Sequence, residues 1–215
     1  LRGYDKFFMD LAMNKEYADT LLDKVLDLYC RMYTNYLREV GEYAQLIYIT
    51  DDLGTQVSLL MSPKMFREQV KPKFKALNDH LKAHSEAKIM FHSDGAIDPL
   101  LEDLIEIGVD IINPVQTSTK GLEDTLSLKE KYGDRLSFHG AIDVQQIMPK
   151  ATVAELKLEV ARRIHDLGAN GGYILAPCHN IGYDIPVENV VALYEAAQEY
   201  GGLNQTELKK ILERG

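Results

Sequence analysis

Short apolar segments alternate with amphipathic segments along most of this chain. The apolar segments are mostly continuous, which is typical of parallel strands that are covered on both faces. The predicted strands cover residues 45–50, 88–95, 109–116, 136–143 and 173–180. Strands that alternate with helices predict an α/β protein.

The segments between the strands carry apolar residues at helical spacing. In the longest one, residues 17–40, a stripe of apolar side chains is predicted to face the core: Leu21, Val25, Leu28, Met32 and Tyr36. Further helices are predicted from Ser62–Pro63 to 84, over 98–107, up to about 132, over 152–167 behind a capping box, over 186–200, and as an exposed polar helix after 203.

Polar residues follow each predicted strand. They are Asp51, Asp52, His92, Asp94, Asn113, Gln116, His139, Asp143, His179 and Asn180. Ligands bind at the carboxyl ends of strands both in doubly wound sheets and in (β/α)₈ barrels. Five such strand ends suit the circular mouth of a barrel, and the nucleotide-binding patterns G-x-G-x-x-G and Walker A do not occur.

The sequence therefore predicts an α/β TIM (β/α)₈ barrel that is incomplete. A full barrel takes about 250 residues, whereas this chain has 215 and supplies about five C-terminal strand–helix units preceded by helices. We expect residues 1–215 to form a single barrel domain that lacks its N-terminal part, which agrees with a first residue other than Met.

Composition narrows the functional classes. Hydrophobic residues at 46% and charged residues at 27% indicate a folded, soluble protein. The net charge of −9 argues against a nucleic-acid-coating role but permits a small-molecule substrate. No apolar run is long enough for a membrane span. Two cysteines cannot form a disulfide framework, so we expect a cytoplasmic protein.

Candidate metal ligands lie on two strand ends. His92 and Asp94 are two residues apart and so point the same way from a strand. His179 supplies a third donor, with Cys178 beside it as an alternative ligand. Zinc accepts His, Asp and Cys alike. The alternative is that His92 and Asp94 bond each other or cap the next helix.

Other polar residues are candidates for catalysis and substrate binding. Of the neighbouring carboxylates, we expect Asp51 to cap a turn and Asp52 to handle protons, with Gln56 nearby. His139 and Asp143 are predicted to contact substrate, although a backbone carbonyl satisfying His139 is an equal alternative.

Several strand-end motifs together resemble the uroporphyrinogen decarboxylase superfamily, which includes corrinoid- and coenzyme-M-linked methyltransferases. The motifs are 91–95 (Phe-His-Ser-Asp-Gly), 108–116 (Gly-Val-Asp-Ile-Ile-Asn-Pro-Val-Gln), 138–143 (Phe-His-Gly-Ala-Ile-Asp), and Cys178–His179 followed by 186–189 (Pro-Val-Glu-Asn). The resemblance covers nearly the whole chain and implies a (β/α)₈ barrel with its site at the C-terminal mouth.

In the methyltransferase branch, the resemblance implies a zinc ion held by an H-x-C pair and a later Cys, which activates a thiol. His92 matches the first ligand, Asp94 stands at the first Cys position, and His179 falls at the second. Replacing two thiolates with Asp and His replaces soft ligands with harder ones, in the sense of hard and soft Lewis bases. Zinc, another divalent metal or no metal thus all remain open.

The decarboxylase branch is similar at 140–143, with Ala141 where that branch has Asn. Its arginine-rich N-terminal motif has no counterpart here, and no strand end in this chain carries an acid-binding arginine.

Three hypotheses follow. The first is a metal-dependent methyltransferase that works with a corrinoid protein. In it, His92, Asp94 and His179 hold the metal, Asp52 joins His92 and His179 in catalysis, and Gln56, Asn113, Gln116, His139 and Asp143 contact substrate. The second is a metal-free uroporphyrinogen decarboxylase of porphyrin biosynthesis. The third is a non-catalytic barrel fragment that acts as a binding module. A homo-oligomer is compatible with all three.

Overall fold

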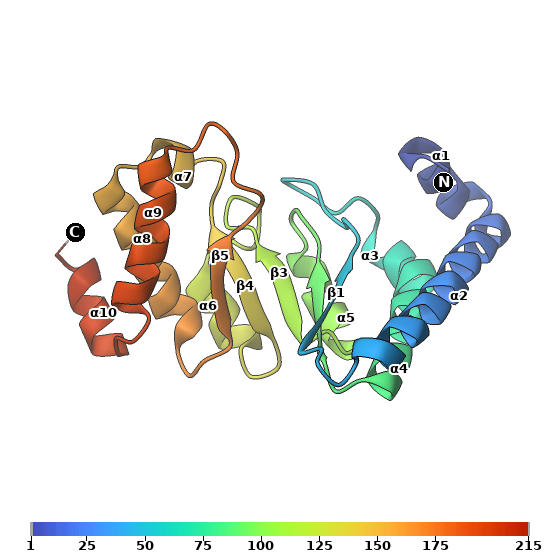
Figure 1. The fold of residues 1–215 in the computed structure, drawn as a ribbon. Coiled ribbons are helices and arrows are strands. Elements are labelled where there is room, and N and C mark those ends of the chain that lie inside the picture. Colours follow the sequence, from blue (N-terminus) through green and yellow to red (C-terminus); the bar gives the residue numbers. More distant parts are fainter. Residues whose placement is uncertain (1, 215) are drawn as a thin grey trace.

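Five parallel strands form one curved sheet in the computed structural model, which describes residues 2–214 (Figure 1). The strands lie in chain order, β1-β2-β3-β4-β5, and each pairs in parallel with the next. They are β1 Leu46–Thr50, β2 Lys88–His92, β3 Ile111–Val115, β4 Ser137–Ile142 and β5 Tyr173–Pro177. This is part of a TIM barrel, as the sequence predicted.

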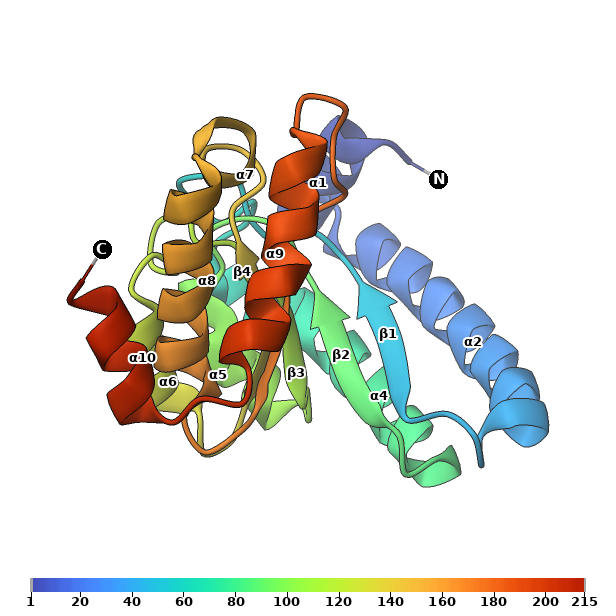
Figure 2. The same cartoon turned by 60° about the vertical axis from the view of Figure 1, so that its left-hand side comes forward.

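Helices connect the strands and cover the sheet. They are α1 Tyr4–Met13, α2 Lys15–Val40, α3 Pro63–Met65, α4 Lys71–His84, α5 Leu101–Glu106, α6 Thr125–Tyr132, α7 Ile147–Lys150, α8 Val153–Gly168, α9 Val187–Tyr200 and α10 Gln205–Leu212. A π-helical turn at Phe66–Val70 precedes α4, and a 3₁₀ turn at Asp98–Leu100 precedes α5. In Figure 1, α2 and α4 lie to the right of β1, and α8 to α10 lie to the left of β5; Figure 2 shows α2 along the outer side of β1.

The predicted pattern of strands and helices is confirmed, with three additions. Helices α1 and α7 and the π-helical turn were not predicted from the sequence. The strands are shorter than the apolar runs, so that Asp94 and Gln116 lie past the ends of β2 and β3. The capping box at Thr152 and Glu155 is present at the start of α8.

Helix α2 packs on the core through a different face from the predicted one. Leu28 and Tyr36 of the predicted stripe are 56% and 59% exposed. The residues that pack against the core are instead Leu26, Cys30, Tyr33 and Leu37. This helix carries apolar residues on two faces, and its own periodicity does not decide which of them meets the sheet.

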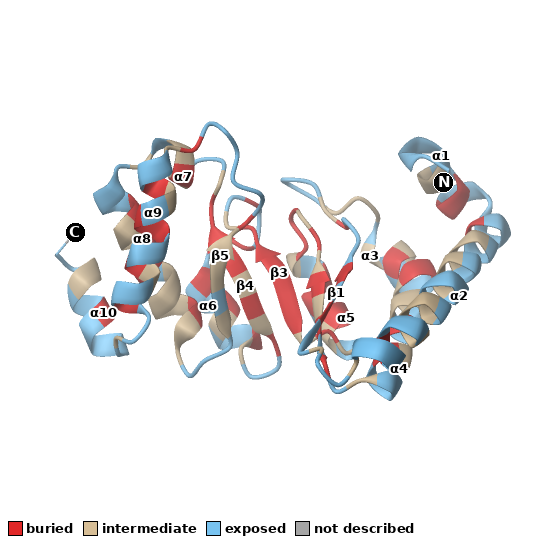
Figure 3. Cartoon of the chain, viewed as in Figure 1, coloured by how far each residue is buried: buried red, intermediate tan, exposed pale blue. Residues whose placement is uncertain are grey.

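Side chains alternate across the strands. Ile47, Ile49, Ile89 and Phe91 are buried on the side that packs against the helices. The even-numbered residues between them, such as Tyr48, point to the concave side, because successive side chains of a strand point to opposite faces. All five residues of the central strand β3 are buried, as Figure 3 shows.

The two outer strands pair on one side only among the described residues. Leu46 in β1 and Ile174 in β5 are 43% and 40% exposed. The edge of β1 is partly occupied by α2, since the Tyr33 hydroxyl donates to the backbone carbonyl of Tyr48 at 3.3 Å. The sheet thus has two open edges, as expected of an incomplete barrel.

The C-terminal helix α10 is less exposed than predicted. Its Leu208 is buried and packs in a second apolar cluster with residues of α8 and α9. Within residues 2–214, the helices do not combine the length and apolarity that crossing a bilayer requires.

Candidate functional site

Three side chains from the ends of β1 and β2 form a cluster of metal-ligand type. One ligand atom each from Asp52, His92 and Asp94 lies within 4.8 Å of the others. His92 Nε2 is 3.9 Å from Asp52 Oδ1 and 3.9 Å from Asp94 Oδ2. His92 and Asp94 therefore do not hydrogen-bond each other, and both face a common point with Asp52.

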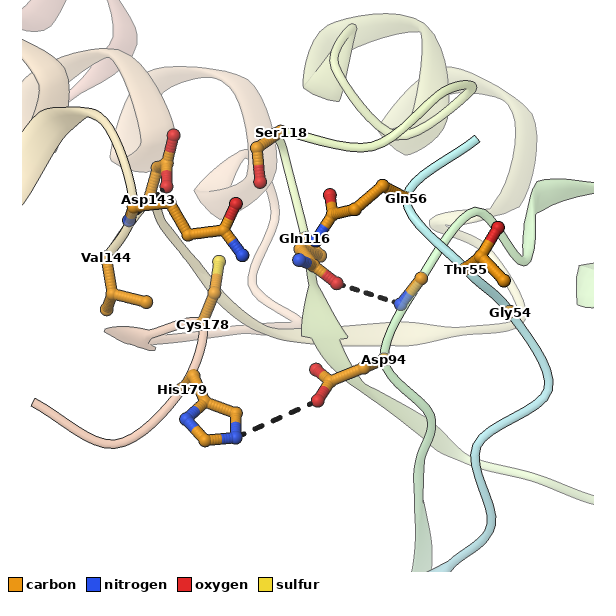
Figure 4. Close-up of a pocket in the computed structure, with 12 residues that line it drawn as sticks. Gly54, Thr55, Gln56, Asp94, Gln116, Ser118, Asp143, Val144, Cys178 and His179 are labelled. Atoms are coloured by element: carbon orange, nitrogen blue, oxygen red, sulfur yellow. Dashed lines mark hydrogen bonds and ion pairs between the residues drawn. The ribbon is translucent and has the colours of Figure 1, made fainter. Parts of the chain in front are cut away.

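His179, from the segment after β5, lies next to this cluster. Its Nε2 is 3.9 Å from Asp94 Oδ2, as the dashed line in Figure 4 marks. The side chain is 56% exposed, whereas that of His92 is 18% exposed. The structure thus brings His179 beside one member of the cluster, although the group within 4.8 Å consists of Asp52, His92 and Asp94.

A close approach of two backbone segments brings Asp52 beside Asp94. A Cβ atom added to Gly54 would lie 2.8 Å from the Ala96 nitrogen, and Gly95 has a φ of +97°, which favours glycine. The Ala96 N–H donates to the Thr55 carbonyl at 2.8 Å. Asp52 Oδ1 accepts a hydrogen bond from the Asp94 backbone N–H at 3.1 Å. The two carboxylates are thereby held on neighbouring loops.

This bond corrects one expectation from the sequence. Asp52, not Asp51, accepts a backbone N–H at the turn, and no hydrogen bond to the Asp51 carboxylate occurs within the described residues. Asp51 borders a mostly apolar cavity between α2, α4 and β1, with Phe74 and Leu77. Desolvation by these neighbours, and then the nearby Asp52 charge, raise the pKa of Asp51 to about 6.

The His92 ring is held from behind by β3. Its Nδ1 lies 2.6 Å from the Asn113 side-chain oxygen, and its ring centroid lies 5.7 Å from that of Tyr48. The Tyr48 hydroxyl is 3.5 Å from the same oxygen. With Nδ1 occupied, Nε2 is the nitrogen that faces Asp52 and Asp94.

His139 lies on the other side of Asn113. Its Nδ1 is 2.5 Å from the Asn113 side-chain nitrogen. Burial lowers the pKa of His139, which favours the neutral ring. An amide side chain rather than a backbone carbonyl therefore satisfies this histidine. Neither His139 nor Asn113 lines the cavity described next, and their predicted contact with substrate remains a prediction.

A cavity of about 470 Å³ opens beside the cluster at the carboxyl ends of the strands (Figure 4). Most of its lining residues are polar, and two of them are carboxylates: Gly54, Thr55, Gln56, Asp94, Gly95, Gln116, Ser118, Asp143, Val144, Gln145, Cys178 and His179. Asp94 and His179 belong to both the cavity and the neighbourhood of the cluster. The twelve lining residues include no Lys or Arg.

Two of the predicted substrate-binding residues also stabilise the walls of the cavity. Asp143 Oδ1 accepts the backbone N–H groups of Gln145 and Gln146, at 2.7 and 3.2 Å, just before α7. Gln116 Oε1 accepts the Gly95 N–H at 2.8 Å, which leaves its amide nitrogen for a ligand (Figure 4). Gln56 lines the cavity as predicted.

Cys178 is buried in the cavity wall. It is 6% exposed, and its Sγ lies 3.1 Å from the Val115 carbonyl, to which the thiol donates. Burial raises the pKa of the thiol to about 12. Because thiolate is the form that binds metals, this environment favours the carboxylates and His92 as ligands over Cys178.

We expect Cys178 to resist thiol-specific reagents in the native protein. In a Cys30→Ser variant, labelling by a chromogenic disulfide at pH 8 should be on the order of a hundredfold slower than for an exposed thiol, because both access and thiolate are limited. Unfolding in urea should restore rapid labelling. Fast labelling of the folded variant would show an accessible thiolate and return Cys178 to the set of candidate ligands.

Sequence reasoning missed three residues that contribute to the site. Tyr48 lies within a strand and reads as an ordinary apolar position, yet it packs on His92. Ser118 and Gln145 lie in loops after β3 and β4 and line the cavity. The one signal in the sequence that could have identified Ser118 and Gln145 is that each lies a few residues after a predicted strand.

Comparisons with known proteins agree with this architecture. The family model described as uroporphyrinogen decarboxylase (URO-D) matches residues 1–200. A solved structure of a methyltransferase from Methanosarcina mazei is similar with a TM-score of 0.71 and 23% sequence identity. The match covers 92% of this chain and 54% of that one, so this chain spans about half the length of that relative. The search of curated proteins found no match.

Proposed function

This chain belongs to the uroporphyrinogen decarboxylase family, and from that membership and its strand-end site we propose that it is a metal-dependent methyltransferase. A divalent metal ion, zinc in the first instance, is its cofactor. Its partner is a corrinoid protein that donates or accepts the methyl group. The observation that carries the proposal is the cluster of Asp52, His92 and Asp94 beside a polar cavity.

The donor set fits a divalent metal ion. One imidazole nitrogen and two carboxylates are ligands that zinc accepts. The Nδ1 atom of His92 is already engaged by Asn113, so Nε2 is the donor atom toward the two carboxylates. The metal would act as a Lewis acid that lowers the pKa of a bound nucleophile.

The remaining residues bind and orient the substrate. The amide nitrogen of Gln116, the side chain of Gln56 and the hydroxyl of Ser118 border the cavity and offer hydrogen bonds to a small polar molecule. His179 borders both the cavity and Asp94, and we assign it the transfer of protons to and from the substrate. In this assignment Asp52 serves as a metal ligand.

The charge of the cavity favours methyl transfer over porphyrinogen decarboxylation. A substrate with several carboxylates needs cationic partners, and the twelve lining residues include no Lys or Arg. Two carboxylates at the site also repel a polyanion, whereas they attract a divalent cation.

Metal binding is the first test. Protein prepared without added metal and then exposed to zinc should take up about one ion per chain by elemental analysis. Zinc at 100 times its dissociation constant should raise the free energy of unfolding by about 2.7 kcal/mol, because the ion binds only the folded chain. Chelation should reverse the shift. No uptake and no shift would overturn the metal-dependent function and favour a binding module.

Methyl transfer is the second test. Methylcobalamin and a thiol acceptor, incubated with the zinc-loaded protein, should react faster than without it, followed by the absorbance of the cobalt centre. Carbon dioxide release from uroporphyrinogen by the metal-free protein would instead support the decarboxylase.

A further inference from the structure

One side-chain amide lies between two histidines at the centre of the site. Asn113 is 8% exposed and belongs to β3, between the strands that carry His92 and His139. Its oxygen is 2.6 Å from His92 Nδ1, and its nitrogen is 2.5 Å from His139 Nδ1. A single carboxamide therefore touches the same type of ring nitrogen on both sides.

The two ends of a carboxamide are chemically different. The oxygen only accepts hydrogen bonds and the nitrogen only donates them. His92 must therefore carry a proton on Nδ1, whereas His139 must have a bare Nδ1. A neutral imidazole carries one proton, so His92 has a bare Nε2 and His139 has an Nε2–H group.

A third contact involves the same amide oxygen. The Tyr48 hydroxyl lies 3.5 Å from Asn113 Oδ1, on the side of His92, and donates to it. The oxygen thus accepts from Tyr48 and from His92 Nδ1 together, which its two lone pairs allow.

We propose that Asn113 is a positioning residue that fixes opposite tautomers on its two histidine neighbours, so that His92 presents a bare Nε2 to Asp52 and Asp94. Its purpose rests on the proposed metal-dependent function. With Nε2 unprotonated, the cluster offers three acceptor groups to a cation. With the proton on Nε2, the ring would donate to the carboxylates and could not bind a metal. Outer-shell partners of this kind orient metal-binding histidines.

Nitrogen-15 NMR of the imidazole rings tests the tautomers in chelated protein at a pH where both rings are neutral. The NMR signals of each histidine are assigned with a variant in which that histidine alone is replaced. We expect His92 to be protonated on Nδ1 and His139 on Nε2. Protonation of His92 on Nε2 in the unaltered chain would overturn the proposal. This readout needs neither metal nor activity.

Two substitutions separate positioning from general packing. Asn113→Asp keeps an acceptor toward His92 but removes the donor toward His139, so His139 should change to the Nδ1–H tautomer while His92 keeps its own. Zinc affinity should stay within about tenfold. Asn113→Leu removes both bonds and should weaken zinc binding by about 10- to 100-fold.

The pattern across the two variants decides the outcome. Equal loss of zinc affinity in both, with unchanged tautomers at both histidines, would make Asn113 a packing residue and overturn the proposal. If Asn113→Leu does not fold, the Asn113→Asp variant carries the test through the tautomer of His139. If the unaltered chain shows the expected tautomers but binds no zinc, the proposed function is overturned and the tautomer assignment stands.

Discussion

Replacing His92 with alanine should weaken zinc binding by about a hundredfold or more. Loss of an outer partner of a metal ligand already costs 10- to 100-fold, and His92 is the nitrogen donor of the cluster. The two carboxylates that remain would bind zinc weakly, since water competes for a loosely held cation at this partly exposed site. Calorimetric titration of zinc into chelated protein measures the change.

His84 offers a matched control for this substitution. It is exposed near the end of α4, where Nδ1 contacts the His80 carbonyl at 2.8 Å. His84→Ala should leave zinc affinity unchanged. If His92→Ala binds zinc as tightly as His84→Ala does, the ligand set is wrong.

Replacing Gly95 with alanine should cost roughly 3 kcal/mol of stability and weaken zinc binding as well. The φ of +97° disfavours any residue with a Cβ, and that atom would lie under 3.0 Å from the backbone of Gly54. The conformation costs about 1–2 kcal/mol, and a collision between packed groups costs about 1–3 kcal/mol more. Because these two loops hold Asp52 beside Asp94, relieving the collision separates the carboxylates.

Gly171 provides the control that isolates the collision. Its φ is +84°, but a Cβ there would meet nothing within 4 Å. Gly171→Ala should therefore cost only about 1–2 kcal/mol, the conformational part, and leave zinc binding intact. Chemical denaturation measures both losses of stability. If the two are equal, the close approach of the two loops adds nothing to the cost of the Gly95 substitution.

The strands and their polar ends were predictable because continuous apolar runs and the residues that follow them are local features. The apolar runs around Ile89 and Ile112 read directly as buried strands. The spacing of His92 and Asp94 also placed them together correctly, since both belong to one strand end. Each of these inferences needed only a few consecutive residues.

Features that depend on packing between distant segments were not predictable. The face of α2 that meets the sheet depends on where α4 and β1 lie, so Leu28 was wrongly placed in the core. The choice of Asp52 over Asp51 as acceptor depends on the loop after β2. Nothing in the sequence near Asn113 indicates that its amide lies between histidines of two other strands.

The open edges of the sheet have a consequence for local unfolding. Amide protons in β3 are protected by strands on both sides and by complete burial, whereas β1 and β5 each have a neighbour on one side among the described residues. Elements with fewer neighbours open at lower free energy than the centre of a sheet. Asp52 and His179 follow the two outer strands, while Asn113 belongs to the central one. Among the five strands we therefore expect β3 to exchange most slowly and β1 and β5 fastest, and a ligand that bridges Asp52 and His179 should slow hydrogen exchange most at these two edges.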